Sequence, residues 1–183
     1  VFRADNPFMV AGTTLRMGRS NAVDFAPGGV LAGGFLNRIE GNNYNVTLSG
    51  GTLNVVEYEA QNSVLAGGYG NRIGTNAFSA TLSGGAQNAI GATAEHAVIA
   101  GGDVNAVTAT NGTVGGGASN EVAGANGVVA GGANNRALAA DSAIGGGSGN
   151  VVTNTASRSA IGGGQNNFVS GHGTTIAGGD NNR

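Results

Sequence analysis

The chain has 183 residues with 37 glycines, two prolines, no cysteine and no tryptophan, and its formal net charge is -2 at pH 7. The absence of cysteine excludes a disulfide framework, and scattered arginines with a slightly negative net charge argue against a nucleic-acid-binding protein. No stretch approaches the roughly 18 consecutive apolar residues of a membrane span, so the sequence predicts no direct membrane insertion.

Residues 1–27 do not share the pattern that follows them. They carry Phe2, Phe8 and Phe25 together with Met9 and Met17, and they predict an N-terminal segment that covers the open edge of a repeat structure. A receptor-contacting tip or a junction to a preceding module is the alternative. The chain begins without methionine and ends inside a repeat, which suggests a fragment of a longer protein.

Residues 28–183 repeat one short phrase in constant phase. Ten Gly-Gly pairs, beginning at Gly33 and ending at Gly178, follow one another at intervals of 15 or 17 residues. A disordered glycine-rich segment would not keep this phase, so the period predicts a stacked solenoid. An asparagine lies four residues after the first glycine of every pair, and we call these the ladder asparagines: Asn37, Asn54, Asn71, Asn88, Asn105, Asn120, Asn135, Asn150, Asn167 and Asn182.

Two apolar positions recur in each repeat. One aliphatic residue precedes the glycine pair by two positions, as Leu31 does, and another apolar residue follows the ladder asparagine by two, as Ile39 does. Short segments alternate small or polar residues with aliphatic ones, and no segment carries a helical stripe. The sequence predicts an all-β, flattened β-roll of about ten rungs, each with two inward-facing sides.

The glycines and asparagines have structural roles in this interpretation. Glycine provides positive φ or permits close backbone approach, and asparagine tolerates left-handed backbone, bonds to its own turn and can stack into a ladder. A calcium-binding nonapeptide roll is excluded because its period is nine and the glycine pair is followed by aspartate only at Asp103 and Asp180.

A single roll of this composition has a thin core. Each rung buries about two aliphatic side chains, worth roughly 3–6 kcal/mol, whereas ordering its residues costs on the order of 20 kcal/mol. We therefore expect several chains to share a core. A row of small residues directly before the glycine pairs offers a face where partner backbones could pack: Ala32, Ser49, Ala66, Ser83, Ala100, Gly115, Ala130, Gly145, Gly162 and Ala177.

The repeated phrase xVxGGxxNxAxG resembles the GGxxN variety of YadA-like head repeats in trimeric autotransporter adhesins, and similar repeats occur in other trimeric bacterial and phage fibres. The resemblance covers residues 28–183. It implies a left-handed parallel β-roll in each chain of an intertwined homotrimer, displayed on the bacterial cell surface beyond the outer membrane and anchored through other parts of the protein. The chain shows no coiled-coil stalk or barrel anchor, and its 17-residue repeats carry two extra residues, which we expect to bulge outward in loops such as residues 74–79 and 91–96.

Bulky side chains concentrate in the early repeats, at positions that vary from copy to copy. Because the scaffold does not dictate these positions, we predict that ligand contacts centre on Phe35, Leu36, Tyr44, Tyr58 and Tyr69. The partner is a cell-surface glycan or protein, or the extracellular matrix. Arg38, Arg72 and Arg136 each follow a ladder asparagine, and threefold symmetry could make them a sparse basic ring for acidic glycans.

Nothing in the sequence indicates catalysis, a cofactor or a metal site. His96 and His172 lie in loops five repeats apart, so they cannot serve one metal or one triad within a chain. The sequence thus predicts a non-enzymatic fibre head that acts as an adhesin. The alternative is a passive spacer within a fibre, and an ice-binding solenoid is disfavoured because the position before the aliphatic residue mixes Val, Thr and Ala.

Overall fold

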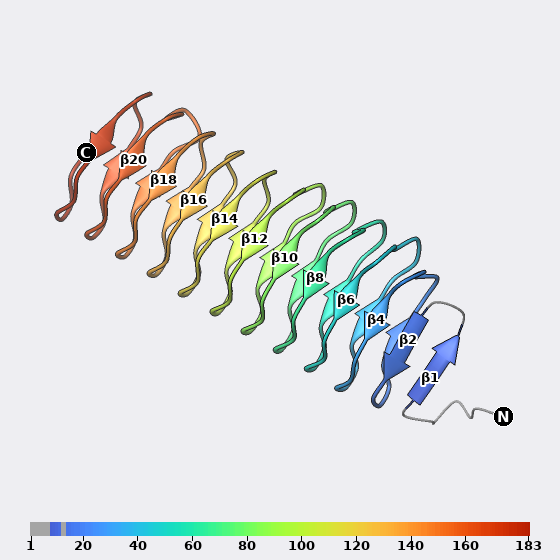
Figure 1. Ribbon diagram of the computed structural model, residues 1–183. Coiled ribbons are helices and arrows are strands. Elements are labelled where there is room, and N and C mark those ends of the chain that lie inside the picture. Colours follow the sequence, from blue (N-terminus) through green and yellow to red (C-terminus); the bar gives the residue numbers. More distant parts are fainter. Residues whose placement is uncertain (1–7, 12–13) are drawn as a thin grey trace.

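The computed structural model describes the backbone of residues 8–11 and 14–183, and side chains from residue 18 onward. This part of the chain contains strands and no helix, as the sequence predicts. All strands after β2 are two residues long, and they stack in parallel register over about nine rungs. The fold is therefore a parallel β-solenoid, and Figure 1 shows its rungs following one another in chain order.

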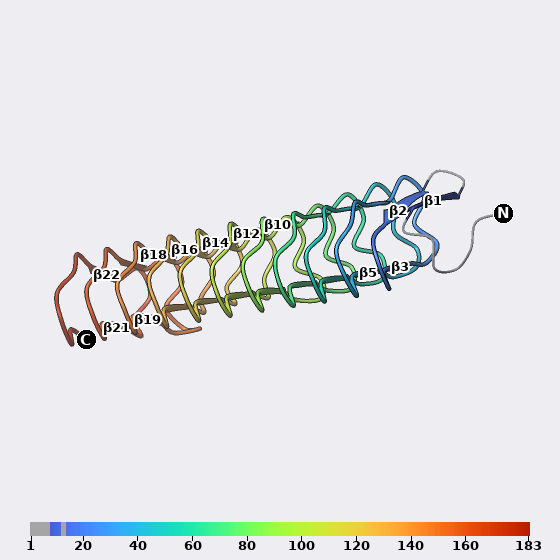
Figure 2. The ribbon, with the colours of Figure 1, turned by 90° about the horizontal axis from the view of Figure 1, so that it is seen from below.

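The strands form two sheets that run the length of the molecule. The first sheet contains β1 (Phe8–Ala11), β2 (Thr14–Met17), β4 (Val30–Leu31), β6 (Thr47–Leu48), β8 (Val64–Leu65), β10 (Thr81–Leu82), β12 (Val98–Ile99), β14 (Thr113–Val114), β16 (Val128–Val129), β18 (Ala143–Ile144), β20 (Ala160–Ile161) and β22 (Thr175–Ile176). The second contains β3 (Ala22–Val23), β5 (Arg38–Ile39), β7 (Val55–Val56), β9 (Arg72–Ile73), β11 (Ala89–Ile90), β13 (Ala106–Val107), β15 (Glu121–Val122), β17 (Arg136–Ala137), β19 (Val151–Val152) and β21 (Phe168–Val169). Figure 2 shows the two sheets as separate layers.

The core lies between these layers and matches the two apolar positions of the repeat. In each strand from β4 to β21 the second residue points inward and is buried, as Leu31 and Ile39 are, whereas the first residue is exposed or half-buried. Parallel pairing brings equal positions of successive rungs together, for example Leu48 beside Leu65. The predicted cross-section with two inward-facing sides is confirmed.

The ladder asparagines form the predicted ladder inside the roll. Asn88 is fully buried, and its Nδ2 atom donates to the Gly84 carbonyl (3.0 Å) and to the Gly102 carbonyl of the next rung (2.8 Å). Its Oδ1 atom accepts from the backbone N–H of Asn105 (2.9 Å). Each asparagine thus satisfies carbonyl and amide groups of neighbouring rungs that would otherwise be buried without partners.

Left-handed backbone occurs beside the ladder asparagine and not on it. The second glycine of the pair has positive φ, as at Gly85 (85°), and so does the residue directly before the asparagine, as at Gln87 (54°). The expectation that the asparagine itself adopts this conformation is wrong. Its side chain already points inward at the start of the next strand, so the chain must reverse direction one residue earlier.

Val104 occupies this left-handed position with a β-branched side chain, at φ 56° and 46% exposed. Such a residue is strained there, whereas asparagine is not. We expect Val104→Asn to raise the free energy of unfolding by about 0.5–1 kcal/mol in chemical denaturation. Val128→Asn, at an exposed strand position, should give no gain; equal effects of the two changes would contradict the strain interpretation.

The loops of the 17-residue rungs, for which the sequence predicts an outward bulge, each contain a buried residue. Their two extra residues add a second tight turn to the loop, and the residue between the two turns points into the core. Ala77 and Ala94 are both fully buried at this position. The 15-residue rungs also bury an alanine in this loop, as at Ala109 and Ala139, so a third inward-facing position occurs in rungs of both lengths.

The rung register begins before residue 28. Asn21 is buried and extends the asparagine ladder, since its Oδ1 atom accepts from the Asn37 N–H (2.9 Å), and β3 pairs with β5. β1 pairs antiparallel with β2 and lies at the end of the twelve-stranded sheet, where it covers that sheet's edge. The predicted apolar contacts of Phe2, Phe8, Met9 and Met17 lie outside the described side chains.

Candidate functional site

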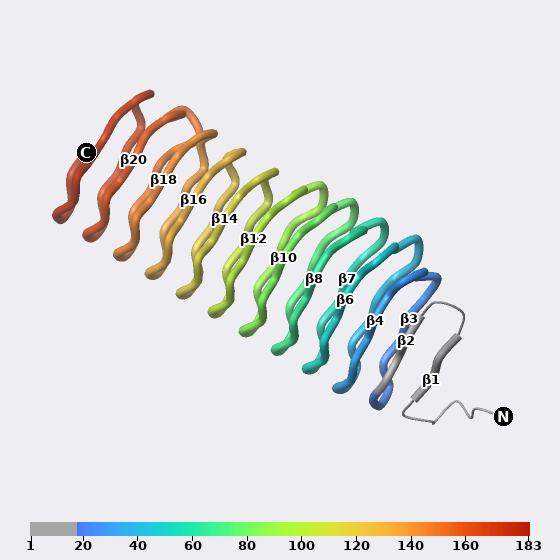
Figure 3. Tube along the Cα trace, viewed as in Figure 1, coloured from blue at the N-terminus to red at the C-terminus, as the bar shows by residue number. Residues whose placement is uncertain are grey.

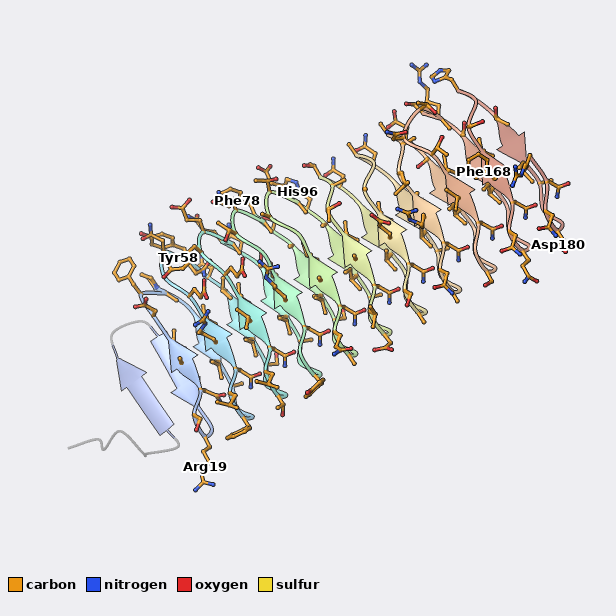
Figure 4. The ribbon with its side chains drawn as sticks, turned by 180° about the vertical axis from the view of Figure 1, so that it is seen from behind. Arg19, Tyr58, Phe78, His96, Phe168 and Asp180 are labelled. Carbon is orange, nitrogen blue, oxygen red and sulfur yellow. The ribbon has the colours of Figure 1, made fainter. Side chains whose placement is uncertain are left out.

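Each rung passes from one sheet to the other at two opposite edges of the roll, which Figure 3 traces along the chain. At one edge, the GGxxN edge, the residues between the glycine pair and the ladder asparagine connect the twelve-stranded sheet to the ten-stranded sheet. At the other edge, the loop edge, the variable loops lead back. In Figure 4 the GGxxN edge runs from Arg19 to Asp180. The loop edge, which carries Tyr58, Phe78 and His96, lies on the opposite side of the roll.

The GGxxN edge carries three of the five predicted ligand residues. Isolated parallel bridges join Phe35 to Thr52 and Thr52 to Tyr69, so Phe35 and Tyr69 lie in one column two rungs apart. Leu36 lies in the adjacent column, and its neighbour in the next rung is Leu53, whose N–H donates to the Phe35 carbonyl (3.1 Å). All four large side chains are exposed: Phe35 43%, Leu36 43%, Leu53 43% and Tyr69 51%.

The loop edge carries the other two predicted ligand residues. Tyr44 and Tyr58 are both exposed, and Tyr44 meets Phe25 edge to face at 6.5 Å between ring centroids. Phe25 is itself 63% exposed. Within one chain the five predicted residues therefore form two groups on opposite edges and not one patch.

Leu53 is an exposed residue that the sequence prediction missed. It occupies one of the variable positions between the glycine pair and the ladder asparagine. The signal that could have found it was positional, because Leu53 repeats the place of Leu36 in the next rung. Two leucines at successive equivalent turn positions predict a contiguous apolar surface.

The three arginines proposed as a basic ring are paired with glutamates. Arg38 bonds to Glu40, Arg72 Nε lies 2.5 Å from Glu57 Oε1, and Arg136 Nε lies 2.7 Å from Glu121 Oε2. These pairs lie on the outer face of the ten-stranded sheet. Their opposite charges cancel locally, so this face lacks the uncompensated positive charge that a sulfated glycan would require.

Glu57 accepts hydrogen bonds from Arg72 and from the hydroxyl and N–H of Thr75 (3.1 and 3.2 Å). The Arg72 hydrogen bond is the largest effect and holds the pKa of Glu57 below its ordinary value of 4.5, against the opposing effect of burial. Because the carboxylate is favoured in the folded state, the pair stabilises the fold above pH 4.5 and loses this effect as the pH falls through the lowered pKa.

We therefore expect the melting temperature of the wild type to exceed that of Glu57→Gln at neutral pH, and the difference to shrink below pH 4.5 as the pH falls through the lowered pKa of Glu57. The pair is partly exposed, so the difference should correspond to less than about 1 kcal/mol. Melting curves from pH 7 to 3 measure it. A difference that persists unchanged at the acid end would show that the glutamine disturbs packing instead.

The twelve-stranded sheet has a flat outer face without charged residues from β4 onward. On this face each rung presents the first residue of its strand. Two positions later it presents one of the ten small residues that directly precede the glycine pairs, the small row, and all ten of these small residues are exposed. We call the following residues, together with the small row, the flat face: Val30, Thr47, Val64, Thr81, Val98, Thr113, Val128, Ala143, Ala160 and Thr175. With rungs about 4.8 Å apart, this uncharged face extends for about 45 Å.

His96 and His172 are both exposed in loops of the loop edge. Among the described residues no group of three or more His, Asp or Glu side chains is placed to hold a metal ion. A search of the same part of the chain finds no helix that is long and apolar enough to cross a membrane.

Comparison with known proteins adds no assignment. No protein-family model matches the sequence, and a search of curated proteins finds no match.

Proposed function

We propose that this chain is the non-enzymatic head of a trimeric surface fibre, an adhesin that attaches a bacterial cell to other cells, glycans or matrix. The observation that carries the proposal is the division of roles along the rung. The positions shared by all rungs form the core, the asparagine ladder and the tight turns, whereas the large exposed apolar side chains occupy variable positions, mostly in the first rungs. Exposed apolar residues on a rigid scaffold are typical of contact sites.

The proposed assembly is an intertwined homotrimer of left-handed rolls. Its support is the flat face, which carries no charged side chain and exposes Val, Ala, Thr, Ser and Gly along the sheet. Small side chains in that face permit close approach of a partner backbone. Sedimentation of the purified chain at micromolar concentration should give three chain masses; a folded monomer would contradict the assembly.

The attachment function predicts that binding depends on the exposed edges and not on the scaffold. We expect the combined change Tyr44→Ser, Tyr58→Ser and Tyr69→Ser, with Phe35→Ser added, to abolish attachment of the fluorescently labelled protein to whole cells or matrix-coated plates. Sedimentation mass and melting should hardly change, because these side chains are exposed.

The second candidate is a passive spacer within a fibre, including a phage fibre, with recognition in another module. The observation favouring it is the composition of the later rungs, where Val104, Val128 and Phe168 are the exposed large apolar residues after Tyr69. Attachment that survives the fourfold change, or a wild type that binds no surface, would favour the spacer.

A further inference from the structure

Two leucines on the GGxxN edge occupy a backbone conformation that leucine disfavours. Leu36 and Leu53 have φ of 56° and 60°, in the left-handed region. Other rungs place glycine, asparagine, glutamine or serine in this column, such as Gly70 and Gln87, and Val104 is the one other apolar residue there. Strain of this kind is found where function requires it. The scaffold has no need of leucine here, since residues without an apolar side chain complete the same turn elsewhere.

These leucines adjoin the two aromatic residues of the same edge. Phe35 precedes Leu36 in the chain, and Tyr69 lies in the Phe35 column two rungs further along, about 10 Å away at the spacing of paired strands. Together the four residues, which we call the apolar strip, form a narrow exposed surface parallel to the long axis of the roll. Thr52 lies between the two aromatic residues in their column.

The apolar strip is uncharged along its whole length. The edge residues from Phe35 to Gln87 in the two columns include no ionisable acid or base except the tyrosine hydroxyl, and the nearest charges in these columns are Arg19 and Asp103 at either end. The adjacent arginines Arg38 and Arg72 are paired with glutamates. A charged polymer would find no counter-charge here, so a neutral partner fits best.

We infer that the apolar strip binds a neutral, extended, β-linked polysaccharide lying along the axis of the roll. This rests on the proposed attachment function and names its ligand class. A β1,4-linked glycan such as cellulose or chitin advances by about one rung per sugar and presents the same ring face at every second sugar. Phe35 and Tyr69, two rungs apart, match that two-sugar repeat.

The contacts are those that a neutral sugar chain requires. Aromatic side chains provide large, rigid apolar surfaces for the C–H faces of pyranose rings, and Leu36 and Leu53 extend this surface beside them. The hydroxyls of Thr52 and Tyr69 can exchange hydrogen bonds with sugar hydroxyls. Each rung repeats at a fixed rise, so the strip is rigid and loses little conformational freedom on binding.

The test is retention of the full chain on microcrystalline cellulose and on chitin particles, with cross-linked dextran as an α-linked neutral control. We expect retention on cellulose, chitin or both, and not on dextran. The double variant Leu36→Asn and Leu53→Asn should lower the retained fraction by at least about tenfold. It should melt at the same or a higher temperature, because asparagine relieves the left-handed strain.

The matched control is Val104→Asn, which replaces an exposed apolar residue with asparagine in the same left-handed column beyond the apolar strip and should leave retention unchanged. The inference is overturned by a wild type that binds neither particle, by equal binding to dextran, or by a double variant that still binds. It is also overturned if the double variant alters the sedimentation mass, since the strip would then be an assembly surface. Attachment to cells without binding to cellulose or chitin removes this inference and leaves the proposed function standing; attachment to no surface removes both.

Discussion

Replacing Gly132 with alanine is expected to destabilise the fold by more than about 4 kcal/mol or to prevent folding. Gly132 is the second glycine of its pair and has φ of 89°. A Cβ atom there would lie 2.1 Å from the Gly147 carbonyl oxygen and 2.9 Å from the Gly147 nitrogen. Both are backbone atoms of the next rung, so relief requires the two rungs to separate. Circular dichroism and denaturant unfolding of the purified variant measure the loss.

Gly131 provides the control within the same pair. It does not have left-handed backbone, and a Cβ atom built on it meets nothing within 4 Å. Gly131→Ala should therefore fold normally and gain up to about 1 kcal/mol, because alanine restricts the unfolded chain. If both substitutions were equally harmful, close approach of the rungs at the second glycine would not be the reason for the glycine pair.

Replacing Asn88 with alanine is expected to lower the free energy of unfolding by about 3 kcal/mol per chain. The change removes two donors to carbonyl groups and one acceptor for a backbone N–H, all inside the roll. Buried groups left without partners cost about 1–3 kcal/mol each, partly offset where water enters the space. Chemical denaturation of the variant and the wild type measures the difference.

Asn182 permits a comparison with the same side chain at an exposed position. Its Nδ2 atom donates to the Gly178 carbonyl (3.1 Å) and to Asn167 Oδ1 (2.8 Å), yet the residue is exposed. Water can replace these bonds, so Asn182→Ala should cost less than about 1 kcal/mol. Similar losses at Asn88 and Asn182 would mean that burial of the ladder does not determine its contribution.

The large differences expected within one glycine pair and along one asparagine column have a common cause. Neighbouring rungs approach closely at the GGxxN edge. The second glycine and the ladder asparagine therefore contact the backbone of the next rung. The side chains of Phe35, Leu36 and Tyr69, at outward positions of the same edge, are exposed instead. The solenoid can therefore vary Phe35, Leu36 or Tyr69 without altering its stacking, which is the property that a binding surface requires.

Much of the fold could be read from the sequence because its determinants are local and repeated. The period placed Leu31 and Ile39 in the core, the spacing of four residues tied each ladder asparagine to its glycine pair, and the alternation predicted two sheets. Equal positions of successive repeats must meet when rungs stack, so the asparagine ladder followed from the period as well.

Other features depended on how loops of different rungs stack, and the tertiary structure alone decided them. It placed Phe35 and Tyr69 on one edge and Tyr44 and Tyr58 on the other, because side-chain direction at a corner follows from where the chain reverses. It also placed the left-handed residue at the position before the asparagine, and it buried Ala77 between the two turns of a long loop. Local pattern determines which residues are buried along a strand, whereas the path of a turn is determined by the backbone of the rung against which it packs.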